Sequence, residues 1–245
     1  MESTVADFWH MVLQERATAV VMLCRLAEAG KPKCYEYYPT AAARWKTFGA
    51  VTVEHRGVEY DSADEAAAGT TVEGDGDDEH LLKRDVRVSR SDTLESENVT
   101  IYQFEHWPDK SVPRTSTATL RICNLLDQFT ADGRPVVVHC SAGIGRTGTV
   151  AAVWLARRRL AHSQGPGPSA VSLKTVVEQL RQQRLLAIQT DMQYLFVHRA
   201  LVDHFRTKGY FRDTHDGYVS FDRDYRILCA RKAPQQHDAD RIPDQ

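Results

Sequence analysis

Residues 136–150, VVVHCSAGIGRTGTV, join a short β-branched run to a longer apolar run through a turn of small residues. The first run is typical of a central strand, and the second, which begins near Arg146, fits a helix. In such a unit the backbone N–H groups of the turn and of the first helical turn point toward one centre. The sequence therefore predicts a binding site for a tetrahedral oxyanion at residues 140–146, which we call the anion loop.

Two side chains of the anion loop carry chemistry. Arg146 can bind two oxygens of an oxyanion with its planar guanidinium. Cys140 would lie beneath the anion, where the N–H groups, the helix dipole and Arg146 favour its thiolate, and Thr147 can hydrogen-bond that sulfur. A lone cysteine at a strand end is more often buried and inert. The complete string His-Cys-x5-Arg-Thr nevertheless predicts in-line attack of a thiolate on phosphorus.

The composition argues against several classes of protein. The 245 residues, 42% hydrophobic and 26% charged, suit one large domain or two small ones. A net charge of −2 gives no reason to expect nucleic acid or an anionic membrane as a partner. The apolar runs are too short to span a bilayer, and the N-terminus does not resemble a signal peptide. Five scattered cysteines without a C-x-x-C pair indicate neither a zinc site nor a disulfide framework, so we expect a reduced, intracellular protein.

Hydrophobic patterning predicts strands mainly in the first half of the chain and helices mainly in the second. We expect helices over residues 4–16, 115–131, 146–162, 172–184 and 190–206, and strands over 19–26, 81–90, 97–107 and 135–140. Residues 48–60 predict a hairpin with a turn near Gly57. Loops are expected over 61–79 and 163–169, and a frayed tail over 234–245. This order indicates an α/β fold of the α+β kind, with Trp9, Trp45 and Trp154 in the core.

The string VHCSAGIGRTGT resembles the signature of the cysteine-based protein tyrosine phosphatases, in the phosphotyrosine-specific rather than the dual-specificity branch. Residues 4–39 are similar to the family's stretch that ends in Lys-Cys-x-x-Tyr-Trp-Pro, with Tyr38 in the place of the tryptophan. HWPDKSVP, residues 106–113, resembles the mobile acid loop, with Ser111 replacing a glycine. LLAIQTDMQYLFVHRAL, residues 185–201, resembles the segment that carries two glutamines. The resemblance covers most of residues 4–206 and implies a twisted mixed β-sheet flanked by helices.

The resemblance also implies a role for each matching residue. Cys140 would be the nucleophile that forms a cysteinyl-phosphate, and Arg146 would bind the phosphate and stabilise the transition state. Asp109 would protonate the leaving tyrosine oxygen and then activate water, and Gln189 would orient that water. The substrate-binding set would be Ser141, Ala142, Gly143, Ile144, Gly145, Arg146 and Gln189.

Seven further residues would support the reaction: His139 and Thr147 beside the thiolate, Trp107 and Pro108 in loop closure, Glu28 on the arginine, Lys33 near the acid loop, and Gln193 beside Gln189. Each has a structural alternative when it is taken alone. Asp109 could be a turn residue, the two glutamines a polar helix face, and Glu28 and Lys33 surface charges. Cys24, Cys123 and Cys229 are expected to be inert.

The sequence departs from the family pattern at its N-terminus. The family domain normally begins earlier, and it includes an Asn-Arg-Tyr loop whose tyrosine stacks on the substrate ring; no such string occurs in this chain. We therefore expect an N-terminally shortened catalytic domain over residues 1–206, followed by an extension over 207–245 that is partly ordered and ends in a disordered tail. As a hypothesis, the extension covers surface left bare. Its deletion would then lower the melting temperature sharply, and an unchanged melting temperature would refute the idea.

Three functions are open at this point. The first is an active phosphatase, free of metal and cofactor, that acts on phosphotyrosine proteins in cytoplasmic signalling without a nucleic-acid or membrane partner. The second is a phosphotyrosine-binding pseudophosphatase that is catalytically weak or inactive, and the third is a scaffold with a vestigial site. The intact set of Cys140, Arg146, Asp109 and Gln189 favours the first.

Overall fold

The structure is a computed structural model that describes residues 1–40, 42–61, 80–93, 95–162 and 171–232. A six-stranded sheet in the order β4-β5-β6-β7-β1-β8 organises the fold, and a second sheet pairs β2 with β3. The strands are β1 (Ala19–Met22), β2 (Ala27–Glu28), β3 (Lys31–Pro32), β4 (Trp45–Phe48), β5 (Val51–Asp61), β6 (Leu81–Arg90), β7 (Ser96–Gln103) and β8 (Val136–His139). The helices are η1 (Glu2–Thr4), α1 (Val5–Gln14), α2 (Thr117–Phe129), α3 (Arg146–His162), α4 (Leu173–Gln183), α5 (Asp191–Thr207) and α6 (Asp216–Lys232).

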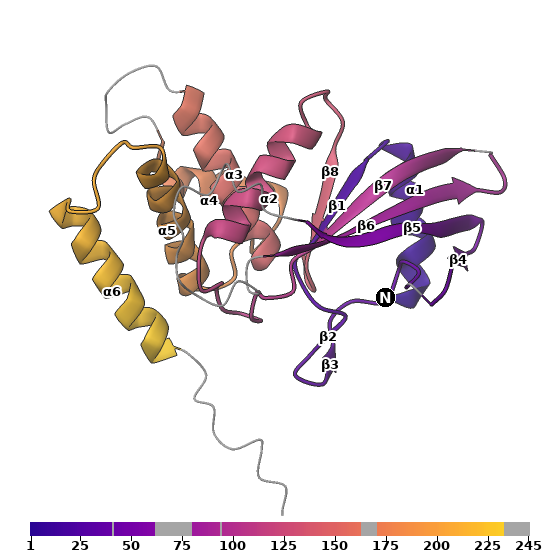
Figure 1. The fold of residues 1–245 in the computed structure, drawn as a ribbon, viewed down its shortest axis with the longest axis horizontal. Helices are drawn as coiled ribbons and strands as arrows, with labels where there is room; N and C mark the ends of the chain where they lie inside the picture. Colours follow the sequence, from indigo (N-terminus) through magenta and orange to yellow (C-terminus); the bar gives the residue numbers. More distant parts are fainter. Residues whose placement is uncertain (41, 62–79, 94, 163–170, 233–245) are drawn as a thin grey trace, which may run out of the picture. The chain divides into compact units, whose positions relative to one another are not determined.

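The main sheet is mixed, which confirms the expected fold class. Strands β4, β5, β6 and β7 pair antiparallel, whereas β1 pairs in parallel with both β7 and β8. Figure 1 shows the sheet as twisted, with α2, α3 and α4 grouped together near β8 and α1 beside the other strands. The helices predicted over residues 4–16, 115–131, 146–162, 172–184 and 190–206 are all present; α3 has the predicted ends, and the ends of the other four are shifted by one or two residues.

The parallel strands bring distant segments of the chain to one edge of the sheet. In the register of β1, Met22 lies opposite both Gln103 of β7 and His139 of β8. The carboxyl ends of parallel strands open at the same edge, which is where sites form in sheets of this kind. The segments that follow these three strands, residues 23–33, 104–113 and 140–147, therefore begin side by side.

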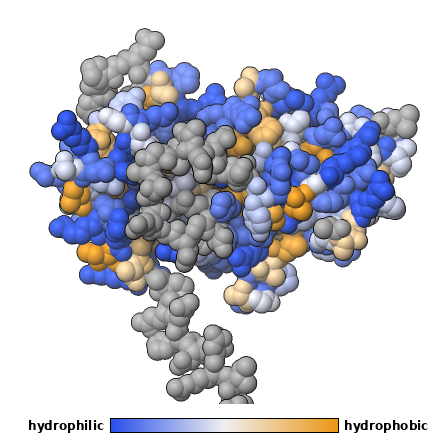
Figure 2. All heavy atoms as spheres, in the orientation of Figure 1, coloured by the Kyte–Doolittle hydropathy of each residue, from blue (hydrophilic) through white to orange (hydrophobic). Residues whose placement is uncertain are grey.

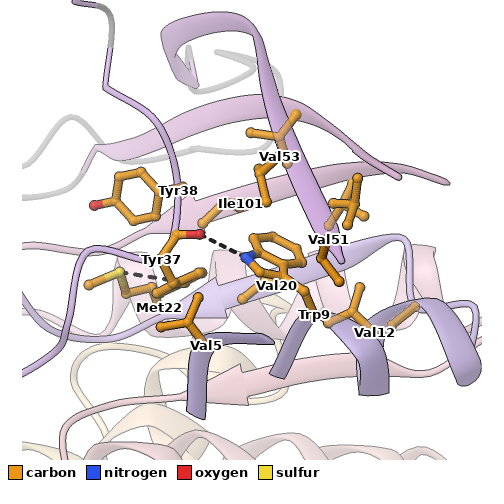
Figure 3. Close-up of a cluster of buried hydrophobic side chains, with 14 of the residues drawn as sticks. Val5, Trp9, Val12, Val20, Met22, Tyr37, Tyr38, Val51, Val53 and Ile101 are labelled. Atoms are coloured by element: carbon orange, nitrogen blue, oxygen red, sulfur yellow. Dashed lines mark hydrogen bonds between the residues drawn. The ribbon is translucent and has the colours of Figure 1, made fainter. Parts of the chain in front are cut away.

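Helix α1 is held against the sheet by its apolar face. Val5, Trp9 and Val12 recur at helical spacing and are buried in a cluster with valines and isoleucine of the strands. The indole nitrogen of Trp9 donates a hydrogen bond of 2.7 Å to the backbone oxygen of Tyr37 (Figure 3). This contact fixes the segment after β3, which approaches the end of β8 through Tyr37.

Three details of the predicted fold are wrong. Gly57 does not end a strand, because β5 runs through it with a bulge between His55 and Gly57, and the hairpin turn is at Gly49, whose φ of +59° favours glycine. The strand expected over 19–26 ends at Met22, after which the chain leaves the main sheet. Trp45 is 59% exposed on the edge strand β4, whereas Trp9 is fully buried as predicted. The view in Figure 2 shows other exposed hydrophobic residues in small groups among hydrophilic ones.

Contacts divide the chain into two compact units, Met1–His204 and Phe205–Gln245. Within the second unit, the guanidinium of Arg206 lies 5.8 Å from the ring centre of Tyr218 and 3.2 Å from a carboxylate oxygen of Asp213. The ring of Phe211 also packs on Tyr218. The predicted assignment of residues 1–206 and 207–245 to a domain and an extension stays a prediction, and the predicted tail and the two predicted loops lie largely outside the described residues.

Candidate active site

The anion loop links the end of β8 to the start of α3, as the sequence predicts. Cys140 follows the strand directly and is 8% exposed, and Arg146 opens the helix and is 3% exposed. Gly143 has a φ of +67°, a conformation that glycine adopts without strain, so the loop can turn back toward the helix. The first hydrogen bond of the helical type runs from the N–H of Gly148 to the backbone oxygen of Ile144. The remaining loop N–H groups are the donors that such a turn offers to an anion.

Arg146 is held by a carboxylate and by a backbone oxygen. Its Nη1 donates to Glu28 Oε1 at 2.6 Å and to the backbone oxygen of Leu23 at 2.8 Å, while Nη2 donates to Glu28 Oε2 at 2.5 Å. Partial burial acts to raise the pKa of Glu28, but the hydrogen bonds from Arg146 and from the N–H of Arg25 outweigh it and lower that pKa. Glu28 is therefore ionised and fixes the orientation of the guanidinium.

Asp109 reaches the same arginine from the acid loop. Its Oδ1 accepts from Arg146 Nη2 at 3.2 Å, and its Oδ2 accepts from Lys33 Nζ at 2.5 Å. Burial acts to raise the pKa of Asp109, but the hydrogen bond from Lys33 and the charges of both cations outweigh it and lower the pKa. In this arrangement Asp109 is a carboxylate shared by two cations.

The acid loop is anchored by Trp107. This side chain is buried and packs on Phe196 with ring centres 5.7 Å apart, and its indole nitrogen donates to the backbone oxygen of Ser111 at 3.0 Å. Pro108 closes the turn by accepting a hydrogen bond of 3.2 Å from the N–H of Ser111. The left-handed residue of the loop is Lys110, with φ of +55°, so Ser111 stands at a position that does not need glycine's conformational freedom.

The two glutamines share one structural unit at the start of α5. Gln193 is buried, and its Oε1 accepts from the N–H groups of Gln189 at 2.9 Å and Thr190 at 3.3 Å. In return, the hydroxyl of Thr190 accepts from the N–H of Gln193 at 3.1 Å. This reciprocal pattern is a capping box, which caps the N-terminus of α5 and sets the backbone of Gln189. Both glutamine side chains lie against Gly145, where an added Cβ would be 3.0–3.2 Å from their polar atoms.

His139 and Thr147 are the residues predicted to support the Cys140 thiolate. The ring of His139 lies 2.8 Å from the hydroxyl of Tyr37 through Nε2 and 3.2 Å from the backbone oxygen of Cys140 through Nδ1. Burial lowers the pKa of His139 although the Cys140 oxygen favours its protonation, so the imidazole is neutral at pH 7 and orients the Cys140 backbone. The hydroxyl of Thr147 is buried and makes no hydrogen bond within the described part of the chain, so it is free to donate to the sulfur or to a phosphate.

The comparisons with known proteins agree with this geometry. A family model described as protein-tyrosine phosphatase matches residues 1–203. The chain belongs to the protein-tyrosine phosphatase family. It is 30% identical over 207 residues to human receptor-type tyrosine-protein phosphatase C, covering 83% of this chain and 14% of that protein. It is 28% identical over 229 residues to mouse tyrosine-protein phosphatase non-receptor type 9, covering 88% of this chain and 35% of that protein.

Solved phosphatase structures share the fold. The catalytic domain of human protein tyrosine phosphatase non-receptor type 18 matches with a TM-score of 0.68 and 28% identity, over 82% of this chain and 65% of that chain. The same phosphatase in complex with HER2 phosphopeptides matches with a TM-score of 0.68 and 26% identity, over 82% of this chain and 68% of that chain. The chain thus spans much less than two thirds of the length of either curated relative.

The phosphatase domain has supporting residues that the sequence did not reveal. Arg184 donates to the backbone oxygens of Ala142 at 3.1 Å and Gly143 at 3.4 Å, and so braces the anion loop from outside. Arg181 donates to the backbone oxygens of Ala187 and Ile188 and holds the segment before Gln189. Both arginines bind main-chain oxygens of distant or irregular segments, for which a sequence carries no motif.

Two groups of features are absent from the described residues. No cluster of three or more His, Cys, Asp or Glu side chains that could hold a metal ion occurs in the described ranges. No helix within the part of the chain that the structure describes is long and apolar enough to cross a membrane.

An open cavity of about 450 Å³ lies beside Gln189, lined by residues of α4 and of the start of α5.

Proposed function

We propose that this phosphatase domain hydrolyses phosphotyrosine in proteins through a cysteinyl-phosphate at Cys140. The observation that carries the proposal is the assembly around Arg146. Glu28 fixes the guanidinium by two hydrogen bonds, Asp109 lies 3.2 Å from it, and Cys140 begins the loop that the arginine ends. A charged, oriented arginine of this kind stabilises the charge that develops on transferring phosphoryl oxygens.

In the first step, the Cys140 thiolate attacks phosphorus and the bond from phosphorus to the tyrosine oxygen breaks. Asp109 gives its proton to that oxygen, because a phenol is a better leaving group than a phenolate. Asp109 must therefore be protonated when substrate is bound. A phosphate dianion on Arg146 would compete for the guanidinium that now contacts Asp109 and would add negative charge nearby, and both effects raise the pKa of Asp109.

In the second step, water attacks the phosphorus of the cysteinyl-phosphate and the bond from sulfur to phosphorus breaks. Asp109, now a carboxylate, takes the proton of the water, and Gln189 orients the water. The capping box formed by Thr190 and Gln193 supports this role, since it fixes the backbone of Gln189 against Gly145. The products are inorganic phosphate and the Cys140 thiolate, so the cycle closes.

One observation favours a second candidate function, a phosphotyrosine-binding domain with weak turnover. Asp109 is bound by Lys33 and Arg146, and the lowered pKa of Asp109 disfavours the protonated form that the first step needs. If substrate binding does not release this carboxylate, the domain binds phosphotyrosine and turns it over slowly. Binding of a phosphotyrosine peptide without release of phosphate selects this second function.

The experiment that tests the proposal is release of phosphate from a phosphotyrosine peptide by the full chain, without added metal. We expect turnover by the wild type and none above background for Cys140→Ser, because serine is a far weaker nucleophile at neutral pH. Cys123→Ser, which changes a buried cysteine on α2, is the matched control and should keep the wild-type rate. Undiminished turnover by Cys140→Ser would exclude the mechanism.

We propose further that the protein acts inside the cell, in signalling through phosphotyrosine. A thiol nucleophile is preserved in a reducing compartment, and one relative bears the name of a non-receptor phosphatase. Immunolocalisation in intact and permeabilised cells tests this; staining without permeabilisation would contradict it.

A further inference from the structure

Two cysteines that the mechanism does not use lie next to the active site. Cys24 follows Leu23, whose backbone oxygen binds Arg146, and Cys34 follows Lys33, which binds Asp109. Strands β2 and β3 pair Glu28 with Lys31 and Ala27 with Pro32, so they fold residues 24–34 back on themselves. The backbone oxygen of Leu26 accepts from the N–H groups of both Lys33 and Cys34, at 2.8 and 3.2 Å. The two cysteines therefore close the base of this hairpin.

The thiols of Cys24 and Cys34 are neighbours at that base. Each thiol acts on the pKa of the other, and both belong to the same cluster of buried side chains, Cys24 as a member and Cys34 packed against it. The Cys34 thiol also donates to the backbone oxygen of Tyr35 at 3.3 Å. Two neighbouring thiols on a folded-back segment meet the first requirement for a disulfide, which is proximity without a large backbone shift.

The two thiols have different environments. Cys24 is 1% exposed, whereas Cys34 is half-buried and can meet a small oxidant. The hydrogen bond from Cys24 lowers the pKa of Cys34 despite its burial, and the same bond together with burial raises the pKa of Cys24. Cys34 is thus the more acidic and the more exposed of the two thiols, and the thiolate is the form that peroxide oxidises.

We propose that Cys24 and Cys34 are a peroxide-sensitive thiol pair that forms an intramolecular disulfide at the base of the β2–β3 hairpin. Hydrogen peroxide oxidises the Cys34 thiolate to a sulfenic acid, with one water as product. The Cys24 sulfur then attacks the Cys34 sulfur, the sulfur–oxygen bond breaks, and a second water leaves with the thiol proton. Two thiols and one peroxide thus give one disulfide and two waters.

The position of this pair gives the disulfide a consequence for the site. Residues 24–34 carry Glu28 and Lys33, which hold Arg146 and Asp109. Cys24 also lies close enough to Arg146 and Cys140 for their charges to act on its thiol. Formation of the disulfide would therefore consume one molecule of hydrogen peroxide next to the active site, while Cys140 itself stays unmodified.

The test uses the full chain with Cys140→Ser, which removes the nucleophile and makes the result independent of phosphatase activity. This variant is treated with hydrogen peroxide, alkylated and digested with trypsin without reduction. Cys24 and Cys34 fall in different tryptic peptides, residues 17–25 and 34–44, so a disulfide appears as a linked pair. We expect loss of two of the four thiols that remain from the five cysteines, and full recovery with a thiol reductant.

Four further measurements make the outcome decisive. The linked peptide should be absent after either Cys24→Ala or Cys34→Ser, and present after Cys229→Ser, the matched control on α6. Cys123 should remain a thiol throughout, because burial raises its pKa to about 12. The unmutated chain should give the same linked peptide, which guards against variants that fold poorly. Cys34 found unmodified, as a sulfinic acid, or linked to Cys140 instead of Cys24 would overturn the proposal.

Discussion

At the scale of single residues, Arg146 is the residue on which the site depends. Its guanidinium donates hydrogen bonds to two carboxylates and a backbone oxygen, all from segments more than 30 residues away in the sequence, and the side chain is 3% exposed. Burying a guanidinium is costly unless its donors are paired, so Glu28 and the Leu23 oxygen are needed to keep it in place. In the proposed mechanism Asp109 is the exchangeable partner, because the phosphate of the substrate takes its place on the guanidinium.

Glu28→Gln should weaken both the fold and phosphate binding. The change leaves Arg146 with a neutral partner in a largely buried place, which costs about 1–3 kcal/mol of unfolding free energy. We expect the affinity for orthovanadate to fall at least tenfold, which corresponds to about 1.4 kcal/mol. Urea unfolding and vanadate inhibition measure the two effects. Glu59→Gln, in an exposed pair with Lys83, is the control and should change stability by less than about 0.5 kcal/mol; equal losses in the two variants would contradict the account.

Lys33→Ala should move the pH profile of kcat/KM. Lys33 lowers the pKa of Asp109 in the free enzyme, so its removal raises that pKa and keeps the acid protonated to higher pH. The descending limb that reports Asp109 should therefore shift upward, by about one pH unit. Lys31→Ala, an exposed lysine of the same hairpin, should leave the limb in place. A limb that does not move in Lys33→Ala would show that Lys33 does not act on Asp109.

At the scale of elements, sequence patterns predicted the helices better than the turns. Five helices have the apolar spacing and length that specify them locally, and α3 has the predicted ends, Arg146 and His162. The turn at Gly57 was wrong because a glycine fits a bulge as well as a turn, and only the pairing with β6 distinguishes the two. The cysteine and the arginine of the anion loop were predictable because they are close in sequence. The contacts of Arg184 and Leu23 were not, because they depend on folding.

Gly148→Ala should separate α3 from the segment that carries Gln189. A Cβ at residue 148 would lie 2.6 Å from the backbone nitrogen of Ile188, and backbone there cannot yield without a shift of the chain. Overpacking of this kind costs about 1–3 kcal/mol. Chemical denaturation should show that loss together with slower turnover. Gly57→Ala, where a Cβ meets no atom within 4 Å, is the matched control; a wild-type midpoint for Gly148→Ala would refute this packing.

Gln193→Ala should slow the second chemical step more than the first. The change removes the capping box that fixes the Gln189 backbone, at a cost of about 1 kcal/mol. Rapid-mixing kinetics with an aryl phosphate should then show a burst of released phenol followed by a slower steady state than in the wild type. Gln182→Ala, an exposed glutamine of α4, should leave both phases unchanged. A variant without a burst and with a normal steady state would contradict the role of Gln193.

At the scale of the whole molecule, the strand order explains why the site is where it is. β1 lies between β7 and β8 and runs parallel to both, so three segments that are far apart in sequence leave the sheet at one edge. They deliver Glu28, Asp109 and Cys140, and the start of α5 adds Gln189 next to Gly145. This convergence makes one candidate site for phosphate out of four separate motifs. No local pattern contains it, since the parallel register is set by the packed core.

The most direct measurement is a search for phosphate covalently bound to Cys140 during turnover. The Gln189→Ala variant is mixed with an aryl phosphate, quenched with acid within the steady state, digested and analysed by mass spectrometry. The account predicts that the variant accumulates phosphate on the peptide that contains Cys140, because loss of the oriented water slows hydrolysis of the cysteinyl-phosphate. Turnover with an unmodified Cys140 peptide, or with phosphate on another residue, would contradict it.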